Sequence, residues 1–369
     1  MLIIVALVFS VSGCGKKYHL KRDVEMPSSA WPLARHDCQS TGMMKSDFKG
    51  NLNHKWSEKV SGSPIGPLSI GAGKIIICAS NGRVYFLDKD SGRNRGRLKH
   101  KGIAQTGLAM VDSLAYFAHG PNKNRFLCLN LHNQHKLWKA DLKDVTGPPI
   151  IIDDRIYLAD GLGLLECRNR ITGKVIWADT TDARSTAGPS YDDGIVYFPF
   201  DDGKLRGYEA LTGELIFSIN LEEPLLSKTA VDSLVFVAGV DGIFTALDKK
   251  TGDVVWQRKF EWPIWTAPVV DKDMVYIGDN GGYLRALDKT AGRTVWTFKS
   301  NGVILASPIA LGDFLLFASL DRYLYCLDKR TGLLSSKWKT GHEVRFPPIS
   351  DGESIFIAAH DGTIHCLGD

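Results

Sequence analysis

The chain has 369 residues, of which 44% are hydrophobic and 23% charged, and it contains 37 glycines. This composition is typical of a folded globular protein with many tight turns and excludes a disordered chain. The 45 basic and 41 acidic side chains leave a formal net charge of only +4 without a concentrated basic stripe, so we expect no nucleic-acid partner.

The first predicted element is an export signal over residues 1–13. An apolar run over residues 1–9 is too short to span a bilayer and is followed by small residues and a cysteine. The string Val11-Ser12-Gly13-Cys14 resembles a bacterial lipobox, which implies cleavage before Cys14 and lipidation of its thiol. We therefore expect a lipidated tether over residues 14–30, and the alternative is a signal peptide without lipidation.

Within the rest of the chain, residues 31–369, a pattern recurs with a period of about 40 residues. A turn residue recurs at gaps of 39 to 42 residues: Asp88, Asn130, Asn169, Glu209, Asp248, Asp288, Asp328 and Gly368. In most repeats a glycine follows four residues later, as expected where a turn needs positive φ. An aromatic residue follows eight residues later in five repeats, at Trp138, Trp177, Phe217, Trp256 and Trp296, while Trp338 is displaced by two. We expect these rings to pack against the neighbouring repeat.

Each repeat reads as four short strands. In one of them the strands are predicted at 307–310, 314–318, 323–327 and 335–338, and Asp-Gly or Asn-Gly pairs link the second strand to the third in several repeats. No helical periodicity appears after residue 30. These patterns predict an all-β fold, an eight-bladed β-propeller of four-stranded antiparallel blades. The last repeat lacks a fourth strand and residues 52–57 form a spare one, so we expect the N-terminal and C-terminal strands to pair and close the ring.

Cysteines and histidines give no sign of a metal or catalytic centre. Four cysteines (Cys128, Cys167, Cys326 and Cys366) share one register of different repeats, about 10 Å apart on neighbouring blades, whereas a disulfide needs Cα atoms within about 7 Å. We expect them to be free and buried, with Cys38 the most plausible exception. The pair His132/His135 lacks a third ligand nearby in the sequence, and His360 and His365 flank an Asp-Gly turn and should point to opposite ends of a hairpin. Most carboxylates fall at turns, where they bond their own backbone.

One repeat carries a specific family resemblance. The segment 242–256, from Gly242 through Asp248 and Gly252 to Trp256, resembles the pyrroloquinoline-quinone-type (PQQ-like) propeller repeat, and the resemblance extends from Trp31 onward. That superfamily contains quinone-dependent dehydrogenases and non-enzymatic lipoproteins, the latter best known from the outer-membrane β-barrel assembly machinery. The enzymes need calcium ligands and a catalytic carboxylate, and many carry a Cys-Cys disulfide. Neither Cys-Cys nor a haem-attachment Cys-x-x-Cys-His occurs in this sequence.

The resemblance therefore favours a non-catalytic envelope lipoprotein without a cofactor that acts as a protein-binding scaffold in outer-membrane β-barrel assembly. The expected partner is a barrel-assembly protein or another envelope protein, and the expected form is a monomeric propeller, lipid-anchored in the outer membrane and facing the periplasm. The alternatives are a PQQ-dependent dehydrogenase-like or cofactor-sensing propeller and a cell-wall or sugar-binding propeller.

The resemblance also implies where a partner binds. In the assembly lipoproteins a leucine- and arginine-bearing loop and an acidic loop on neighbouring blades contact the partner, and they match residues 222–228 and 261–265 here. Residues three before the proline of successive repeats should neighbour one another at the mouth of the central funnel. The predicted partner-binding residues are Leu225, Leu226, Lys228, Trp262, Trp265, Leu305, Arg345 and Phe346.

Overall fold

The computed structural model describes residues 37–71, 73–99, 103–104, 108–120, 125–131, 135–145 and 147–369. The predicted export signal, Cys14, the tether and the lead-in at Trp31 lie outside these residues. The described part of the chain consists of strands and connecting turns without a helix. Accordingly, no helix long and apolar enough to cross a membrane is found in that part.

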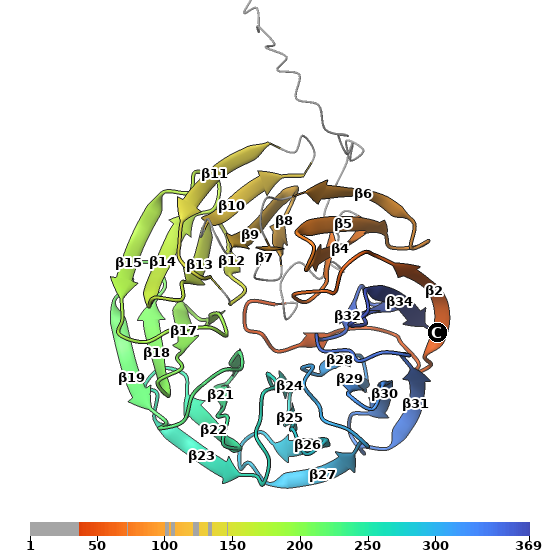
Figure 1. Ribbon diagram of the computed structural model, residues 1–369. Coiled ribbons are helices and arrows are strands. Elements are labelled where there is room, and N and C mark those ends of the chain that lie inside the picture. The colour runs from red at the N-terminus through yellow and green to blue at the C-terminus, as the bar shows by residue number, and fades with distance from the viewer. Residues whose placement is uncertain are drawn as a thin grey trace, which may run out of the picture.

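Eight antiparallel sheets surround one central axis, and we number them as blades 1 to 8 (Figure 1). Blades 1 to 4 are β3 (Ser69–Gly71), β4 (Lys74–Ala79), β5 (Arg83–Asp88) and β6 (Asn94–Lys99); β8 (Ala109–Val111), β9 (Leu114–Gly120), β10 (Arg125–Asn130) and β11 (Lys136–Asp141); β12 (Ile150–Ile152), β13 (Arg155–Ala159), β14 (Leu164–Asn169) and β15 (Val175–Thr180); and β16 (Ser190–Asp192), β17 (Ile195–Pro199), β18 (Lys204–Glu209) and β19 (Leu215–Asn220).

Blades 5 to 8 are β20 (Ala230–Val231), β21 (Leu234–Ala238), β22 (Ile243–Asp248) and β23 (Val254–Lys259); β24 (Val269–Val270), β25 (Met274–Gly278), β26 (Tyr283–Asp288) and β27 (Thr294–Lys299); β28 (Ile309–Leu311), β29 (Phe314–Ser319), β30 (Tyr323–Asp328) and β31 (Leu334–Lys339); and β32 (Ile349–Ser350), β33 (Ser354–Ala358), β34 (Thr363–Gly368) and β2 (Asn53–Lys59). Two short strands extend this plan: β1 (Met43–Met44) pairs with β28, and β7 (Ile103–Ala104) pairs with β9. The predicted eight-bladed propeller is confirmed.

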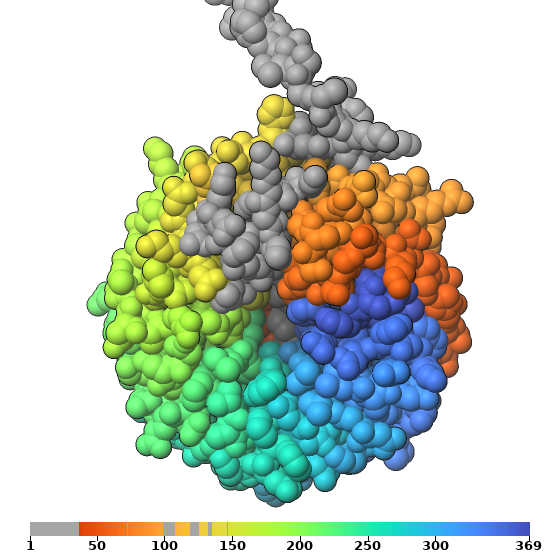
Figure 2. All heavy atoms as spheres, viewed as in Figure 1, coloured from red at the N-terminus to blue at the C-terminus, as the bar shows by residue number. Residues whose placement is uncertain are grey.

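The blades bury both of their faces against one another. All five residues of the second strand β17 are buried, whereas the outer fourth strand β19 is mostly exposed. In the space-filling view the blades abut side by side around a narrow central hollow (Figure 2). Because radial packing covers both sheet faces, the second strands read as nearly continuous apolar runs, and the outermost strand is the most exposed.

The ring closes as predicted, by pairing of its first and last strands. β2 pairs antiparallel with β34, with Asn53 opposite Gly368 and Lys59 opposite Thr363. The carboxylate of Asp369 accepts hydrogen bonds from the backbone N–H groups of Lys49 (2.7 Å) and Asn51 (3.2 Å). This pairing supplies blade 8 with its fourth strand and removes an open sheet edge.

The recurring aromatics seal the joints between blades, as the sequence predicts. The indole N–H of Trp256 donates to the Lys289 carbonyl of the next blade at 2.9 Å. Its ring lies so close to Gly292 that a Cβ there would be 2.6 Å from it, and Gly292 has a φ of +66°. The same indole-to-carbonyl bond is made by four further tryptophans: Trp56, Trp138, Trp177 and Trp296. The recurring glycine thus provides both the turn and the surface on which the ring lies.

The displaced Trp338 takes a different place. Ser336 stands where the other blades have an aromatic, and its hydroxyl donates to the Gly50 carbonyl at 2.6 Å. Trp338 instead stacks on His54 with ring centroids 5.8 Å apart and contacts the His365 ring at 4.8 Å. A separate aromatic cluster therefore secures the joint between blade 7 and the closing blade.

The cysteines of the described residues are all free. Those within the blades (Cys78, Cys128, Cys167, Cys326 and Cys366) are buried as expected, and Cys38 is half-buried. Burial raises the pKa of the Cys78 thiol to about 12. These side chains act as small core residues rather than reactive thiols.

A feature that the sequence did not predict is a segment, residues 38–46, that crosses the middle of the ring (Figure 1). The carbonyl of Cys38 accepts a hydrogen bond from Tyr191 of blade 4, and that of Gln39 accepts one from Val231 of blade 5. Further along, the carbonyl groups of Thr41 and Gly42 accept backbone hydrogen bonds from blade 6 and blade 7, respectively. The segment thereby joins the innermost strands of four successive blades.

Candidate functional site

One face of the propeller gathers two kinds of connection, and we call it the loop face. Hairpin turns between second and third strands pack against the inter-blade loops that lead from a fourth strand to the next first strand. In blade 5, for example, the Phe260 N–H donates to the Gly242 carbonyl at 2.9 Å, and a Cβ on Gly242 would lie 2.7 Å from the Trp262 carbonyl. The turns and the loops therefore form one continuous surface around the central hollow, as the sequence predicts.

Four successive inter-blade loops present one residue at the same position. In each loop a buried apolar residue precedes an outward-facing one: Leu225 precedes Leu226, Ile264 precedes Trp265, Ile304 precedes Leu305, and Val344 precedes Arg345. The buried member is at most 1% exposed in all four loops. Leu226 and Trp265 are 48% and 51% exposed, Arg345 is exposed, and Leu305 is half-buried. Because a core residue anchors each loop, the displayed side chain projects from a fixed backbone.

Trp262 adds a second ring beside this row. It is 41% exposed, and its indole lies against Gly281, where a Cβ would meet the ring at 2.3 Å. Gly281 belongs to the hairpin turn of the neighbouring blade 6, so Trp262 bridges two blades. Phe346, which follows Arg345, is half-buried.

The structure separates the predicted site residues into two groups. Leu226, Trp262, Trp265, Leu305, Arg345 and Phe346 reach the loop face to different degrees. Leu225 and Lys228 are 1% and 6% exposed, and Leu225 belongs to the core between blades 4 and 5. Sequence spacing could not separate Leu225 from Leu226, because the loop backbone decides which of two adjacent leucines enters the core.

Another set of exposed apolar side chains lies on the outer strands, away from the loop face. Val175, Ile176, Leu215, Ile216, Val254 and Val255 are 41–49% exposed. They come in pairs at the beginning of the fourth strands β15, β19 and β23, which form the rim of the ring (Figure 1). We call this set the outer belt, and it provides a matched comparison for the loop face.

Two buried carboxylates of the loop face, those of Asp160 and Asp279, are engaged by their own turn or strand. Asp160 accepts from the backbone N–H groups of residues 162 and 164, at 2.8 and 3.0 Å, and buried Asp279 pairs with Arg285. Hydrogen bonds of this kind favour local turn structure. In the part of the chain that the structure describes, no group of three or more His, Cys, Asp or Glu side chains is placed to hold a metal ion. Asp160 and Asp279 therefore have few oxygen lone pairs left for a calcium ion, which takes six to eight oxygen ligands.

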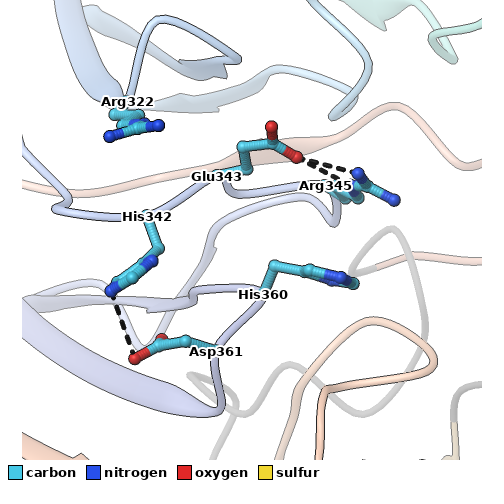
Figure 3. Close-up of a pocket in the computed structure, with 6 residues that line it drawn as sticks. All are labelled: Arg322, His342, Glu343, Arg345, His360 and Asp361. Carbon is cyan, nitrogen blue, oxygen red and sulfur yellow. Dashed lines mark hydrogen bonds and ion pairs between the residues drawn. The ribbon is translucent and has the colours of Figure 1, made fainter.

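A charged cavity of about 310 Å³ lies on the loop face between blades 7 and 8 (Figure 3). It is lined by Arg322, His342, Glu343, Arg345, His360 and Asp361. Glu343 accepts two hydrogen bonds from the Arg345 guanidinium, at 2.8 and 3.1 Å. Its pKa is lowered, chiefly by that bond, with further help from His360 and Arg322. Of these lining residues, only Arg345 is predicted from the sequence as a binding residue.

The two histidines that flank the Asp361-Gly362 turn have different environments. His360 lines the charged cavity, whereas His365 lies in β34 and is only 9% exposed. The pKa of His365 is lowered to about 4, first by burial and then by repulsion from His54. His365 is therefore a neutral packing residue at ordinary pH, and the two rings share no site.

The sequence of the chain is similar to those of two kinds of known protein. A family model described as outer membrane protein assembly factor BamB matches residues 104–179 and 161–368. The BamB of Burkholderia pseudomallei is 22% identical over 229 residues, covering 54% of this chain and 59% of that protein. The dehydrogenase subunit of a quinone alcohol dehydrogenase from Komagataeibacter europaeus is 28% identical over 175 residues, covering 38% of this chain and 22% of that protein. The aligned part thus spans less than two thirds of either relative.

Solved structures show the same architecture. The crystal structure of BamB from Moraxella catarrhalis superposes with a TM-score of 0.74 at 15% identity, covering 86% of this chain and 100% of that one. A europium-containing methanol dehydrogenase superposes with a TM-score of 0.80 at 10% identity, covering 93% and 98%. At these identities the likeness establishes the propeller fold alone.

Proposed function

Because the chain belongs to the family described as outer membrane protein assembly factor BamB, we propose that it is a non-catalytic scaffold that binds a protein of outer-membrane β-barrel assembly. In this proposal Cys14 is lipidated, residues 14–30 tether the propeller to the outer membrane, and the propeller faces the periplasm. The name of the assembly factor relatives supports this role, and the loop face supplies the binding surface.

The observation that carries the proposal is the row of outward-facing apolar side chains on anchored loops. Leu226, Trp262 and Trp265 are each between 41% and 51% exposed on one face. Contiguous exposed apolar surface marks interaction sites, and tryptophan is enriched at the positions that dominate binding energy. The buried neighbours Leu225 and Ile264 hold the loops in place, so little ordering entropy is lost when a partner binds.

Binding of the purified chain to the periplasmic part of a barrel-assembly protein tests the proposal. We expect the double variant Leu226→Ala, Trp265→Ala to weaken binding by at least about tenfold, because truncating a hot-spot residue costs about 2 kcal/mol or more. The control is Leu215→Ala, Val255→Ala on the outer belt, which truncates two apolar side chains of similar fractional exposure. If the control abolishes binding and the loop-face variant does not, the interface lies elsewhere.

A second candidate, a quinone-dependent dehydrogenase, is favoured by the similarity to alcohol dehydrogenase subunits. The engagement of Asp160 and Asp279 by protein groups speaks against it. Incubating the chain with pyrroloquinoline quinone, calcium and a primary alcohol distinguishes the two. Oxidation of the alcohol above the protein-free rate would replace the scaffold proposal with the enzymatic one.

A further inference from the structure

Arg322 adopts a backbone conformation that side chains disfavour. Its φ is +69°, in the left-handed region where a Cβ crowds the backbone. In the other six hairpin turns of this kind within the described residues, the equivalent position is a glycine with positive φ: Gly82, Gly163, Gly203, Gly242, Gly282 and Gly362. Strained positions of this type persist where the surrounding structure enforces them, and they concentrate at functional sites.

Blade 7 keeps the contact between turn and loop although a side chain stands at this position. A Cβ on Gly282 would lie 2.3 Å from the Gly302 carbonyl, and one on Gly362 would lie 2.6 Å from the Val60 carbonyl. Blade 7 keeps the hydrogen bond between loop and turn that other blades make, since the Thr340 N–H donates to the Arg322 carbonyl at 2.9 Å. The next loop residue, Gly341, has a φ of +77°. Arg322 is therefore accommodated without losing the contact between turn and loop.

The side chain of Arg322 lines the charged cavity of about 310 Å³ between blades 7 and 8 (Figure 3). The carboxylates in this cavity already have cationic partners. Glu343 is bonded to Arg345, and Asp361 forms an ion pair with Lys59 at 2.9 Å. The Arg322 guanidinium makes no hydrogen bond or ion pair with any residue that the structure describes. The N–H groups of Arg322 are thus left for a ligand, beside the imidazoles of His342 and His360, although its charge helps to lower the pKa of Glu343.

We infer that this cavity binds the carboxylate of an acidic side chain in an extended segment of a partner protein. A guanidinium presents a planar fork of N–H groups that matches a carboxylate in a bidentate manner. Arg345, at the rim of the cavity, occupies the same loop position as Leu305, Trp265 and Leu226 on the preceding blades. A segment lying along this row would place apolar residues on the leucine and tryptophan side chains and its acidic residue at Arg322.

The inference rests on the proposed function only in taking the ligand to be a protein segment. Its test uses the full chain and two fluorescein-labelled peptides with blocked ends. One alternates Glu and Leu, and the other carries Gln in place of Glu. We expect the Glu peptide to bind about tenfold more tightly, the ratio that one charge-assisted hydrogen bond supplies. Equal affinities for the two peptides would overturn the inference.

Two variants and one control assign the effect to Arg322. Arg322→Gln and Arg322→Gly should both reduce affinity for the Glu peptide to that for the Gln peptide. Arg322→Gly should also raise the melting temperature by about 1–2 °C, because glycine relieves the strain of a positive φ. Arg330→Gln is the control, since Arg330 is an exposed arginine in the turn after β30, on the opposite face of the same blade. Unchanged affinity in the Arg322 variants, or an equal loss in the control, would refute the assignment.

Two further experiments distinguish a site for a peptide carboxylate from a small-anion site and from the proposed function. Free glutarate should compete much more weakly than the Glu peptide, and competition of equal strength would identify a small-anion site instead. Loss of assembly-protein binding in the Leu226→Ala, Trp265→Ala variant concerns only the proposed function. If the barrel-assembly protein fails to bind while the Glu peptide binds through Arg322, the proposed partner is wrong and the carboxylate site stands.

Discussion

Replacing Trp256 with alanine should open the joint between blades 5 and 6. The ring is 7% exposed and lies 6.0 Å from Phe236 and 5.6 Å from Phe244, measured between ring centroids. Burying a tryptophan removes on the order of 200 Å² from water, worth about 5 kcal/mol at about 25 cal/mol per Å². Removal of large aromatic residues from cores costs about 3–5 kcal/mol, since the cavity collapses in part. We expect a loss of that size in the free energy of unfolding.

The bond from the Trp256 indole N–H to the Lys289 carbonyl adds to this loss. It is 2.9 Å long, and its removal costs about 1 kcal/mol. Equilibrium unfolding in guanidinium chloride, followed by far-ultraviolet circular dichroism and by fluorescence, measures the change. Coincident transitions from the two probes would justify a two-state free energy.

The matched control is Trp265→Ala, which removes the same side chain from a position that is 51% exposed. We expect it to cost less than about 1 kcal/mol, as exposed substitutions generally do. Gly292→Ala perturbs the same joint from blade 6, because its new Cβ would lie 2.6 Å from the Trp256 ring. If Trp256→Ala destabilised the protein no more than Trp265→Ala, the sealing role of the recurring aromatics would be wrong.

Three further perturbations address closure, pH and anchoring. Deleting residues 53–59 should abolish the cooperative melting transition and promote aggregation, visible by calorimetry and gel filtration, because β34 then has an unpaired edge. His365 has a folded-state pKa of about 4, below its ordinary value, so the unfolded chain takes up the proton first. Stability should therefore be constant above about pH 7 and fall between about pH 6.5 and 4 by about 2 kcal/mol after solvent screening, and His365→Gln should flatten that decline. Cys14→Ala should move the protein from the membrane to the soluble fraction, and unchanged membrane association would contradict lipidation.

Much of the fold follows from local features that the sequence displays directly. Each Asp-x-x-x-Gly turn contains the reason for its own conformation: Asp288 accepts hydrogen bonds from the backbone N–H groups of Thr290 and Ala291, and Gly292 supplies the positive φ. The aromatic residue of the following strand packs on the equivalent glycine of the next blade, so the period of 40 residues carries both the blade and the joint. Closure was predictable for the same reason, because β34 and β2 are complementary parts of one repeat.

The binding surface required the tertiary structure. Leu225 and Leu226 are chemically identical, and only the packing of the loop against blades 4 and 5 buries the first and exposes the second. Sequence periodicity suggests that position 322 is a turn position, but not that an arginine there faces a cavity built from two blades. The central segment 38–46 lies outside the repeats, and its hydrogen bonds to four blades arise from backbone groups that carry no sequence signature.

The fold could be predicted from the sequence and the binding surface could not, and this difference has a physical cause. Turn geometry, strand alternation and the glycine–aromatic contact depend on residues near one another in sequence or related by the repeat, so the amino-acid types alone specify them. The charged cavity brings together Arg322, His342 and His360 from two blades, and the ion pairs formed around it decide which charged group keeps its hydrogen-bonding capacity for a ligand. Such pairing is decided by distance and burial, which exist only once the ring has closed.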